Sequence, residues 1–405
     1  MDRLPNHQTG AATQTVLIYR NELLATSETF IREQALALRD WRPVLVGRKL
    51  LNQLPLDDLS VHCLTPHART LSSRLLWRAS SMFDTVPPNV KAALRKERAS
   101  LIHVHFGTDA LDAWPLARAL NLPLLITLHG FDITVHRDWW EAGNAGSHLR
   151  SYPRRLLQLA QLPQTSFIAV SEAIRNRAIE FGIPARKVEV KYIGIDPKKF
   201  TPGSVGVADR APRVLFVGRL VEKKGCLYLI DAMAEVRKSV PDAQLIVIGD
   251  GPLRQDLEHR ARALCIEADF LGMQPSAEVK RQLESARVFC LPSVMASNGD
   301  AEGLPISILE AQTSGVPVVT SANGAVGEAV KEGHTGLLFP ERDVVTLATK
   351  LTALLSDDAL ASKIAAQSVA QIAKSFNIAD LTRSLEAAYG AAARRTNLIP
   401  LERRL

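Results

Sequence analysis

The sequence predicts an α/β protein made of two domains, each a parallel sheet with helices on both faces. Short apolar segments alternate with amphipathic ones along the chain, which is typical of parallel sheets covered by helices on both faces. The length of 405 residues suits two domains of roughly 200 residues each. Small and turn-forming residues gather at 202–209, which is the expected linker.

The first half of the chain contains the elements expected of one such domain. Its apolar segments predict strands at 16–19, 44–47, 101–107, 124–130, 166–170 and 188–194. Ser27 and Thr29 form a helix start signal, and Ser171 is expected to cap the helix that follows the fifth strand. A helical region over 71–99 is interrupted at Pro87 and Pro88.

The second half repeats the pattern. Strands are predicted at 213–217, 245–248, 287–293 and 316–320. The helix after the first of these has Leu227, Ile230 and Met233 at helical spacing, so these side chains are expected to face the core. A last helix is predicted over about 379–394.

The sequence predicts no metal site. His103 and His105 share one face of a strand, but no third ligand is evident. His103 is interpreted as structural, and the role of His105 stays open. The four cysteines show no metal or redox spacing, which fits a reducing cytoplasm.

Two glutamates eight positions apart, Glu302 and Glu310, are the most informative residues. Turn-forming residues precede Glu302, and a helix is predicted to open at about Ile306. The unpaired N–H groups at a helix N-terminus bind anions. Carboxylates beside an anion site suit a ligand that also carries hydroxyls, as a sugar nucleotide does. The alternative is that both glutamates are ordinary helix charges.

A second motif follows the strand at 213–217. The chain continues through Gly218, Arg219, Lys224 and Gly225 before a helix begins. The two cations therefore lie at the carboxyl end of a strand, where open α/β sheets bind ligands. Arginine and lysine both bind phosphate oxygens. The alternative is that both are solvated surface cations.

Together these segments resemble the retaining glycosyltransferases of family 4. The resemblance implies the GT-B fold, in which two Rossmann-like, doubly wound domains face a cleft. The resemblance covers nearly all of 211–345. It rests on Gly218-Arg219-Leu220, Lys224-Gly225, the Glu302 and Glu310 pair, and the segments 315–319, 323–328 and 333–338. In the first half, 27–31 and 129–132 resemble the branch found in bacterial exopolysaccharide pathways, such as colanic acid type transferases.

The resemblance implies that a hexosyl group moves from a nucleotide diphosphate sugar to a hydroxyl of a glycan or lipid-linked acceptor. It implies retention of configuration and no metal or other cofactor, and no DxD-like motif stands in a matching place. Arg219 and Lys224, with the N–H groups of Gly303 and Leu304, would stabilise the charge that develops on the leaving phosphate.

The remaining site residues also follow from the resemblance. Glu310 would bind the ribose hydroxyls, and Glu302 would lie near the donor sugar. His129 follows a strand and would contact the donor sugar or the reaction centre. Gly218 would lie against the donor. The alternative for His129 is a hydrogen-bonded structural role.

The sequence departs from the family pattern after the first strand. Many relatives carry a Gly-Gly loop there, whereas this chain reads Arg20-Asn21-Glu22-Leu23. Ser27 and Thr29 are the candidates to replace its phosphate contacts. Asp132 is a further candidate contact, although a hydrogen bond within its own loop is the favoured interpretation.

The resemblance also implies the domain boundaries. Residues 1–203 would form the acceptor-binding domain and residues 210–378 the donor-binding domain. The C-terminal segment, 379–405, is expected to cross back and pack on the first domain.

The basic excess of the chain lies in its first half. Residues 1–200 carry 26 basic and 18 acidic side chains, and the rest carries 23 and 24. Clusters occur at Arg74, Arg78, Lys91, Arg95, Lys96 and Arg98, and at Arg150, Arg154 and Arg155. We expect a cytoplasmic protein with peripheral contact to the anionic inner face of the plasma membrane, and a polyprenyl-pyrophosphate-linked acceptor. Nucleic acid is disfavoured because aromatic residues make up only 5% of the chain and form no stacking pattern beside the clusters.

Two alternative functions stay open beside glycosyl transfer. A GT-B-like sugar-nucleotide epimerase would need general bases placed at the sugar. A non-enzymatic nucleotide-sugar-binding scaffold would not need Arg219, Lys224 or Glu302, and all three are present.

Overall fold

The computed structural model describes residues 14–65, 85–322 and 324–397. The chain divides into two compact units. The first lies within Met1–Ile126, Leu162–Ser166 and Arg383–Leu405, and the second comprises Thr127–Gln161 and Phe167–Thr382. The predicted boundary at 203–210 stays a prediction. Several predicted features lie outside the described residues: the helical segment 71–84 with Arg74 and Arg78, Asn323, and residues 398–405.

A seven-stranded sheet has the strand order β5-β3-β1-β6-β7-β8-β9. The strands are β1 (Gln14–Tyr19), β3 (Trp41–Gly47), β5 (Ser60–Cys63), β6 (Ala99–His105), β7 (Leu124–Leu128), β8 (Thr165–Ala169) and β9 (Val188–Val190). β1 pairs in parallel with both β3 and β6, and Leu17 lies beside Val44 and Ile102. All three side chains are buried. The six strands predicted in this half are confirmed.

Helices connect these strands. They include α1 (Thr29–Leu36), α3 (Pro88–Lys96), α4 (Gly107–Leu120), α5 (Phe131–Thr134), α6 (Arg137–Glu141), α7 (Tyr152–Gln161) and α8 (Glu172–Phe181). The Ser171 hydroxyl accepts a hydrogen bond from the N–H of Ile174 at 3.2 Å, so the predicted cap of α8 is confirmed. α3 begins directly after Pro87, where proline's missing N–H costs no helical hydrogen bond.

A six-stranded parallel sheet lies in the second unit, with the order β12-β11-β10-β13-β14-β15. The strands are β10 (Arg213–Val217), β11 (Gln244–Ile248), β12 (Ala268–Gly272), β13 (Val288–Leu291), β14 (Val318–Ser321) and β15 (Leu337–Phe339). The four strands predicted here are confirmed, and β12 and β15 are additional. Strand order 3-2-1 followed by 4-5-6 is that of a doubly wound sheet.

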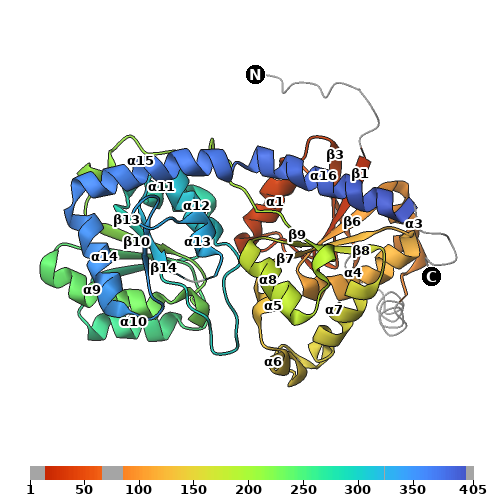
Figure 1. Ribbon diagram of the computed structural model, residues 1–405, viewed down its shortest axis with the longest axis horizontal. Coiled ribbons are helices and arrows are strands. Elements are labelled where there is room, and N and C mark those ends of the chain that lie inside the picture. The colour runs from red at the N-terminus through yellow and green to blue at the C-terminus, as the bar shows by residue number, and fades with distance from the viewer. Residues whose placement is uncertain (1–13, 66–84, 323, 398–405) are drawn as a thin grey trace. The chain divides into compact units, whose positions relative to one another are not determined.

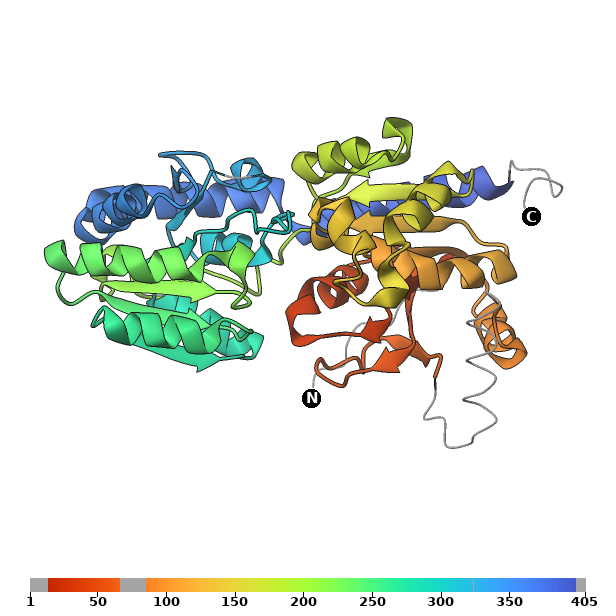
Figure 2. The same cartoon turned by 90° about the horizontal axis from the view of Figure 1, so that it is seen from below.

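Helices cover both faces of this sheet. α9 (Cys226–Ser239) packs against α10 (Arg254–Ala263) and α14 (Val344–Ser356). α12 (Ile306–Thr313) packs against α15 (Asp358–Ser375), and α11 (Ser276–Ser285) contacts β10. Figure 1 labels α9, α10 and α14, which pack together, and α12 and α15, which also pack together. Figure 2 shows the green helices α9 and α10 running along the strands. One expectation for α9 was wrong, because Leu227 is 42% exposed while Leu229 is buried.

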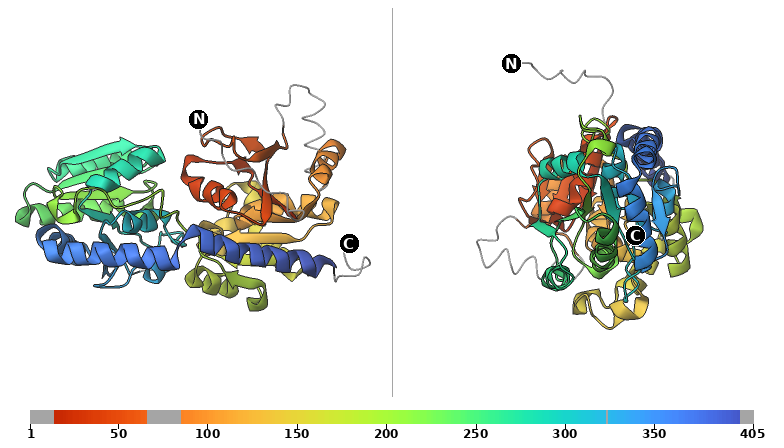
Figure 3. Two further views of the ribbon diagram at one scale, coloured as in Figure 1. Left: turned by 90° about the horizontal axis from the view of Figure 1, so that it is seen from above. Right: turned by 90° about the vertical axis from the view of Figure 1, so that its left-hand side faces the viewer.

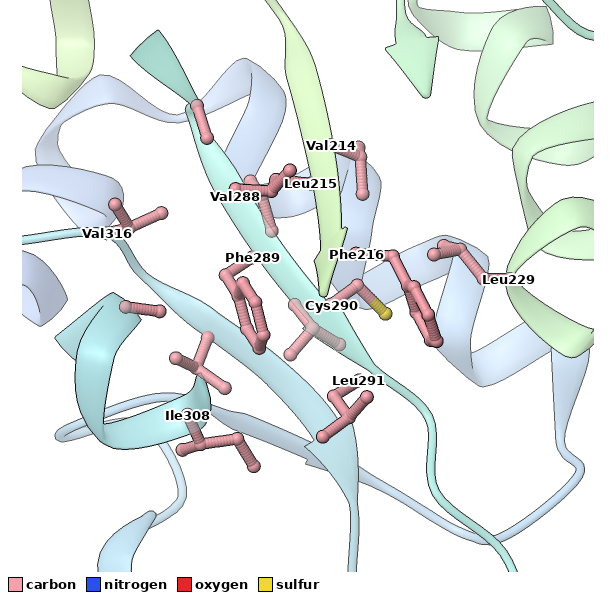
Figure 4. Close-up of a cluster of buried hydrophobic side chains, with 14 of the residues drawn as sticks. Val214, Leu215, Phe216, Leu229, Val288, Phe289, Cys290, Leu291, Ile308 and Val316 are labelled. Atoms are coloured by element: carbon pink, nitrogen blue, oxygen red, sulfur yellow. The ribbon is translucent and has the colours of Figure 1, made fainter. Parts of the chain in front are cut away.

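The core of the second unit fills both sides of β10 and β13. In Figure 4, Phe216 and Cys290 point towards Leu229 of α9, and Phe289 points towards Ile308 of α12. All five side chains are buried. Successive residues of a strand face opposite sides, so a strand buried on both faces must be apolar throughout. This is why the predicted strands were visible as unbroken apolar runs.

The last helix, α16 (Ile378–Asn397), belongs to the first unit from Arg383 onwards. Tyr389 packs edge-on against Trp41, with ring centroids 5.3 Å apart. The carboxylate of Glu386 accepts hydrogen bonds from the N–H groups of Arg39 and Asp40. Figure 3 shows this helix in dark blue beside the strands of the first sheet. No described helix combines the length and apolar composition needed to cross a membrane.

His103 provides a pH-dependent contribution to stability. The ring is fully buried, and Nδ1 lies 2.7 Å from the hydroxyl of Tyr389. Burial lowers the pKa of His103 from 6.5 to about 3. Between these values the unfolded chain binds a proton that the folded chain does not, so stability falls as the pH is lowered. The loss should be about 1.4 kcal/mol per pH unit.

We expect His103→Gln to flatten the fall of the melting temperature between about pH 6.5 and pH 4. The exposed His334 offers a matched control, and His334→Gln should keep the wild-type slope. Equal slopes in both variants would contradict the assignment.

Candidate functional site

The turn between β10 and α9 presents three consecutive charged residues at the carboxyl end of the sheet. The turn begins with Gly218, whose N–H donates to the carbonyl of Ile248 at 3.0 Å. A single 3-10 turn, η5 (Glu222–Lys224), follows, and Gly225 then opens α9 with φ of +66°. A Cβ atom on Gly225 would lie 1.8 Å from the carbonyl oxygen of Pro292. Only glycine allows this approach, which brings η5 beside the segment that follows β13.

The segment after β13 carries the acidic residues. Asp300 and Glu302 precede α12, which begins at Ile306. The N–H groups of Gly303 and Leu304 form no hydrogen bond with any residue that the structure describes. Both residues are buried. N–H groups just before a helix N-terminus can bind an anion, and this role for Gly303 and Leu304 stays a prediction.

Two ion pairs join the two segments. The Nζ atom of Lys224 lies 3.0 Å from Oε1 of Glu302, and Nζ of Lys223 lies 2.9 Å from Oδ1 of Asp300. All four side chains are between 11% and 17% exposed. Oε1 of Glu302 makes no hydrogen bond of good geometry within the described residues, so its contact with Lys224 is electrostatic. The predicted residues Lys224 and Glu302 thus contact each other directly.

Burial and charge oppose each other at these groups. Burial raises the pKa of Glu302, but the ammonium groups of Lys224 and Lys223 outweigh it and the net pKa is lowered. Burial lowers the pKa of Lys223, but the carboxylates of Glu302 and Asp300 outweigh it and the net pKa is raised. Burial raises the pKa of Asp300. Lys223 and Glu302 are therefore both ionised at neutral pH.

Arg219 lies at the same edge of the sheet but is exposed. Within the described part of the chain it forms no ion pair. Its charge disfavours the protonated form of Lys223, so the two cations are close. A Cβ atom on Gly218 would lie 3.4 Å from Cδ of Lys224, so the lysine stem covers that glycine. Lys224 is therefore engaged with Glu302, whereas Arg219 lies exposed at the same edge of the sheet.

Within the second unit, the main chain of His129 lies against the glycine that follows Glu302. His129 follows β7 and is half-buried. A Cβ atom on Gly303 would lie 2.2 Å from the His129 carbonyl oxygen. Gly130, with φ of +137°, would place a Cβ atom 2.9 Å from the carbonyl oxygen of Ala301. Because Gly130 and Gly303 have no Cβ atom, the two main-chain segments can approach each other this closely.

Asp132 holds the loop after β7. It is fully buried, and Oδ1 accepts hydrogen bonds from the N–H groups of His129 at 3.0 Å and Gly130 at 2.9 Å. This is the favoured interpretation, a hydrogen bond within its own loop. The Tyr152 hydroxyl also donates to the Asp132 carbonyl oxygen.

The other predicted residues occupy different positions. Glu310 is half-buried in α12. Ser27 is exposed in the 3-10 turn η1 (Thr26–Glu28), and Thr29 is half-buried at the first position of α1. Both belong to the first unit, so the structure gives no distance between them and the ion pairs of the second.

The pairing within two groups of charged residues was not predicted from the sequence. In the first group, Lys223 directly precedes Lys224, and Asp300, a less favoured candidate than Glu302, lies two positions before it. The second group follows β1, where the guanidinium of Arg20 pairs with Glu28 and Asp109 and lies 4.5 Å from the ring centre of Phe106. No local pattern connects Arg20 with Asp109. Burial raises the pKa of Asp109 to about 6 despite Arg20.

The site residues include no recognisable set of metal ligands. Among the described residues, no group of three or more His, Cys, Asp and Glu side chains is arranged to hold a metal ion.

Comparisons with known proteins find relatives of both halves of the chain. Residues 198–371 match the family described as glycosyl transferases group 1, and residues 29–199 match that described as glycosyltransferase family 4. The chain is 30% identical over 299 residues to the amylovoran biosynthesis glycosyltransferase AmsK of Erwinia amylovora, which covers 72% of this chain and 70% of the relative.

A second sequence relative and a solved structure are also similar to this chain. The chain is 34% identical over 296 residues to a GDP-mannose-dependent monoacylated alpha-(1-6)-phosphatidylinositol monomannoside mannosyltransferase of Corynebacterium glutamicum, over 69% of this chain and 74% of the relative. The structure resembles HepE of Anabaena, solved with UDP and glucose, with a TM-score of 0.74 at 19% identity over 93% of this chain and 100% of the other. That likeness confirms the predicted GT-B fold with its two Rossmann-like domains.

Proposed function

Because the chain belongs to the family 4 (group 1) glycosyltransferases, we propose that it transfers a sugar with retention of configuration and without a metal. The donor would be a nucleotide diphosphate sugar, and the acceptor a glycan or polyprenyl-pyrophosphate-linked hydroxyl in bacterial exopolysaccharide synthesis. The relative named for amylovoran biosynthesis supports the pathway. The neighbour solved with UDP and glucose supports the donor class.

One observation carries the proposal. Nζ of Lys224 lies 3.0 Å from the carboxylate of Glu302, which directly precedes Gly303 and Leu304, and Arg219 lies exposed in the same turn as Lys224. Breaking the glycosidic bond leaves negative charge on the β-phosphate, and preorganised donors stabilise such charge as it develops. In this proposal the two cations do the work that a metal does elsewhere.

The other residues take supporting roles. Glu302 would contact the donor sugar or stabilise its oxocarbenium-like charge, and Glu310 would bind the ribose hydroxyls. His129 would contact the sugar from the segment after β7. Ser27 and Thr29 remain the candidates for phosphate contacts from the first unit, where Arg20 replaces the usual glycines.

The cellular setting is also proposed. The basic excess of residues 1–200 would attract the anionic inner face of the plasma membrane, where a lipid-linked acceptor is presented. Peripheral binding of this kind needs no spanning helix.

A thermal-shift experiment in EDTA tests the donor site. UDP, GDP and ADP are added separately to wild type, Lys224→Ala and Lys238→Ala. We expect one nucleotide to raise the melting temperature of wild type and of Lys238→Ala, but not of Lys224→Ala. Lys238 is a suitable control because its exposed ammonium pairs only with Glu235 among the residues described. A shift that needs added Mg²⁺ would contradict metal independence, and release of the nucleotide from its sugar conjugate would exclude a non-enzymatic scaffold.

A further inference from the structure

The ion pair between Lys223 and Asp300 has no role in the function proposed above. It runs beside the pair between Lys224 and Glu302, since the lysines are consecutive and the carboxylates are two positions apart. The Nζ to Oδ1 distance is 2.9 Å, and the two side chains are 17% and 16% exposed. An ion pair at a protein surface contributes little to stability. In an enclosed pair, removal of one partner leaves the other charge unpaired, which is costly.

The main chain fixes both partners in place. The N–H of Val294 donates to the carbonyl of Lys223 at 2.8 Å. The Glu222 carboxylate accepts from the N–H and hydroxyl of Ser297, at 3.0 and 2.9 Å. The carbonyl of Asp300 accepts from Ala296 at 2.9 Å. Glu222 and Lys223 of η5 therefore hold the segment that leads to Glu302.

Each lysine of this quartet is close enough to both carboxylates for the ion partners to be exchanged. The Glu302 carboxylate acts on both Lys224 and Lys223, and the Lys224 ammonium acts on both Glu302 and Asp300. If Asp300 lost its charge, Lys223 would be free to compete for Glu302. If Lys223 lost its charge, Asp300 would be free to compete for Lys224.

We infer that Lys223 and Asp300 are positioning residues: by neutralising each other they leave Lys224 and Glu302 as the only charges of this quartet that meet the donor. The inference rests on the proposed glycosyl transfer and adds to it two residues that act through their neighbours. It also explains why only the second of two consecutive lysines would face the phosphate.

A double-mutant cycle tests the inference. The variants are Asp300→Asn, Lys223→Gln and the double variant, assayed with the nucleotide sugar whose diphosphate stabilises the wild type. Release of nucleoside diphosphate gives kcat, and calorimetry with the free diphosphate gives Kd. Each single variant should lower kcat about tenfold, and the double variant should recover to within about threefold of wild type.

Affinity should respond differently from rate. Asp300→Asn adds one positive charge and should tighten diphosphate binding about threefold, whereas Lys223→Gln should weaken it about threefold. A purely structural pair would lower the melting temperature without opposite affinity changes or rescue. The exposed pair Glu235 and Lys238 supplies the control, and Glu235→Gln/Lys238→Gln should leave kcat and Kd unchanged.

The outcomes separate the two proposals. An active wild type with wild-type kcat in both single variants, or a double variant as slow as the singles, would overturn the positioning role alone. If one single variant does not fold, the other and the double variant still complete the comparison. A wild type that releases no diphosphate from any nucleotide sugar would overturn the proposed function, and this inference with it.

Discussion

Replacing Lys224 by alanine should lower the rate of glycosyl transfer by about 10²–10³-fold at saturating donor. This corresponds to about 3–4 kcal/mol of transition-state stabilisation, the usual loss when one preorganised donor is removed. The ammonium lies 3.0 Å from Glu302 and its stem covers Gly218, so it is held at the mouth of the turn before any ligand arrives. Steady-state kinetics would measure the effect, with Lys238→Ala as the control.

Lys224→Ala also leaves the enclosed carboxylate of Glu302 without its closest cation. This should lower the melting temperature, because an unpaired enclosed charge is destabilising. Lys224→Ala/Glu302→Gln should recover stability and not the rate, which separates catalysis from folding. A wild-type rate in Lys224→Ala at saturating donor would refute the role of this lysine in stabilising the leaving phosphate.

Replacing Gly225 by alanine should cause a large loss of stability. The new Cβ atom would lie 1.8 Å from the carbonyl oxygen of Pro292, and both are backbone-anchored. Either the start of α9 or the end of β13 must move, and with it η5 and its two lysines. We expect a cost of about 4 kcal/mol or more, which lies in the range of severe single substitutions. Binding of the nucleoside diphosphate should be lost as well.

Gly333 provides a matched control for Gly225. Its φ is +68°, close to the +66° of Gly225, but a Cβ atom there would meet nothing within 4 Å. Gly333→Ala therefore carries only the left-handed strain of about 1 kcal/mol. The melting temperature should fall by about 2–4 °C in Gly333→Ala and by about 8 °C or more in Gly225→Ala. Equal shifts would show that conformational strain, and not the contact with Pro292, dominates.

The strands that could be predicted are those buried on both faces. Val214, Leu215 and Phe216 of β10 form an unbroken apolar run because helices cover each side of the strand. The missed strands β5, β12 and β15 lie at sheet edges. β5 and β12 contain no fully buried residue, so their sequences show no such run.

The position of Leu227 shows the limit of periodicity. Leu227, Ile230 and Met233 recur at helical spacing, yet Leu227 is 42% exposed and Leu229 is buried in its place. Leu227 and Leu229 both lie near the start of the helix, so the spacing of apolar residues allows either of them to face the core. Packing against α10 and α14 selects between them, and the local sequence does not contain that information.

The sequence by itself determined the fold class and the family, and it predicted which residues form the site. Those features depend on local patterns: apolar runs, a turn with Arg219 and Lys224, and a fixed spacing between Glu302 and Glu310. Only the tertiary structure decided which charges meet, since Lys223 and Asp300 are 77 positions apart and Arg20 and Asp109 are 89 positions apart. An ion pair depends on distance in space, and folding sets that distance: β10 and β13 are neighbours in one buried sheet, so the segments that follow them meet.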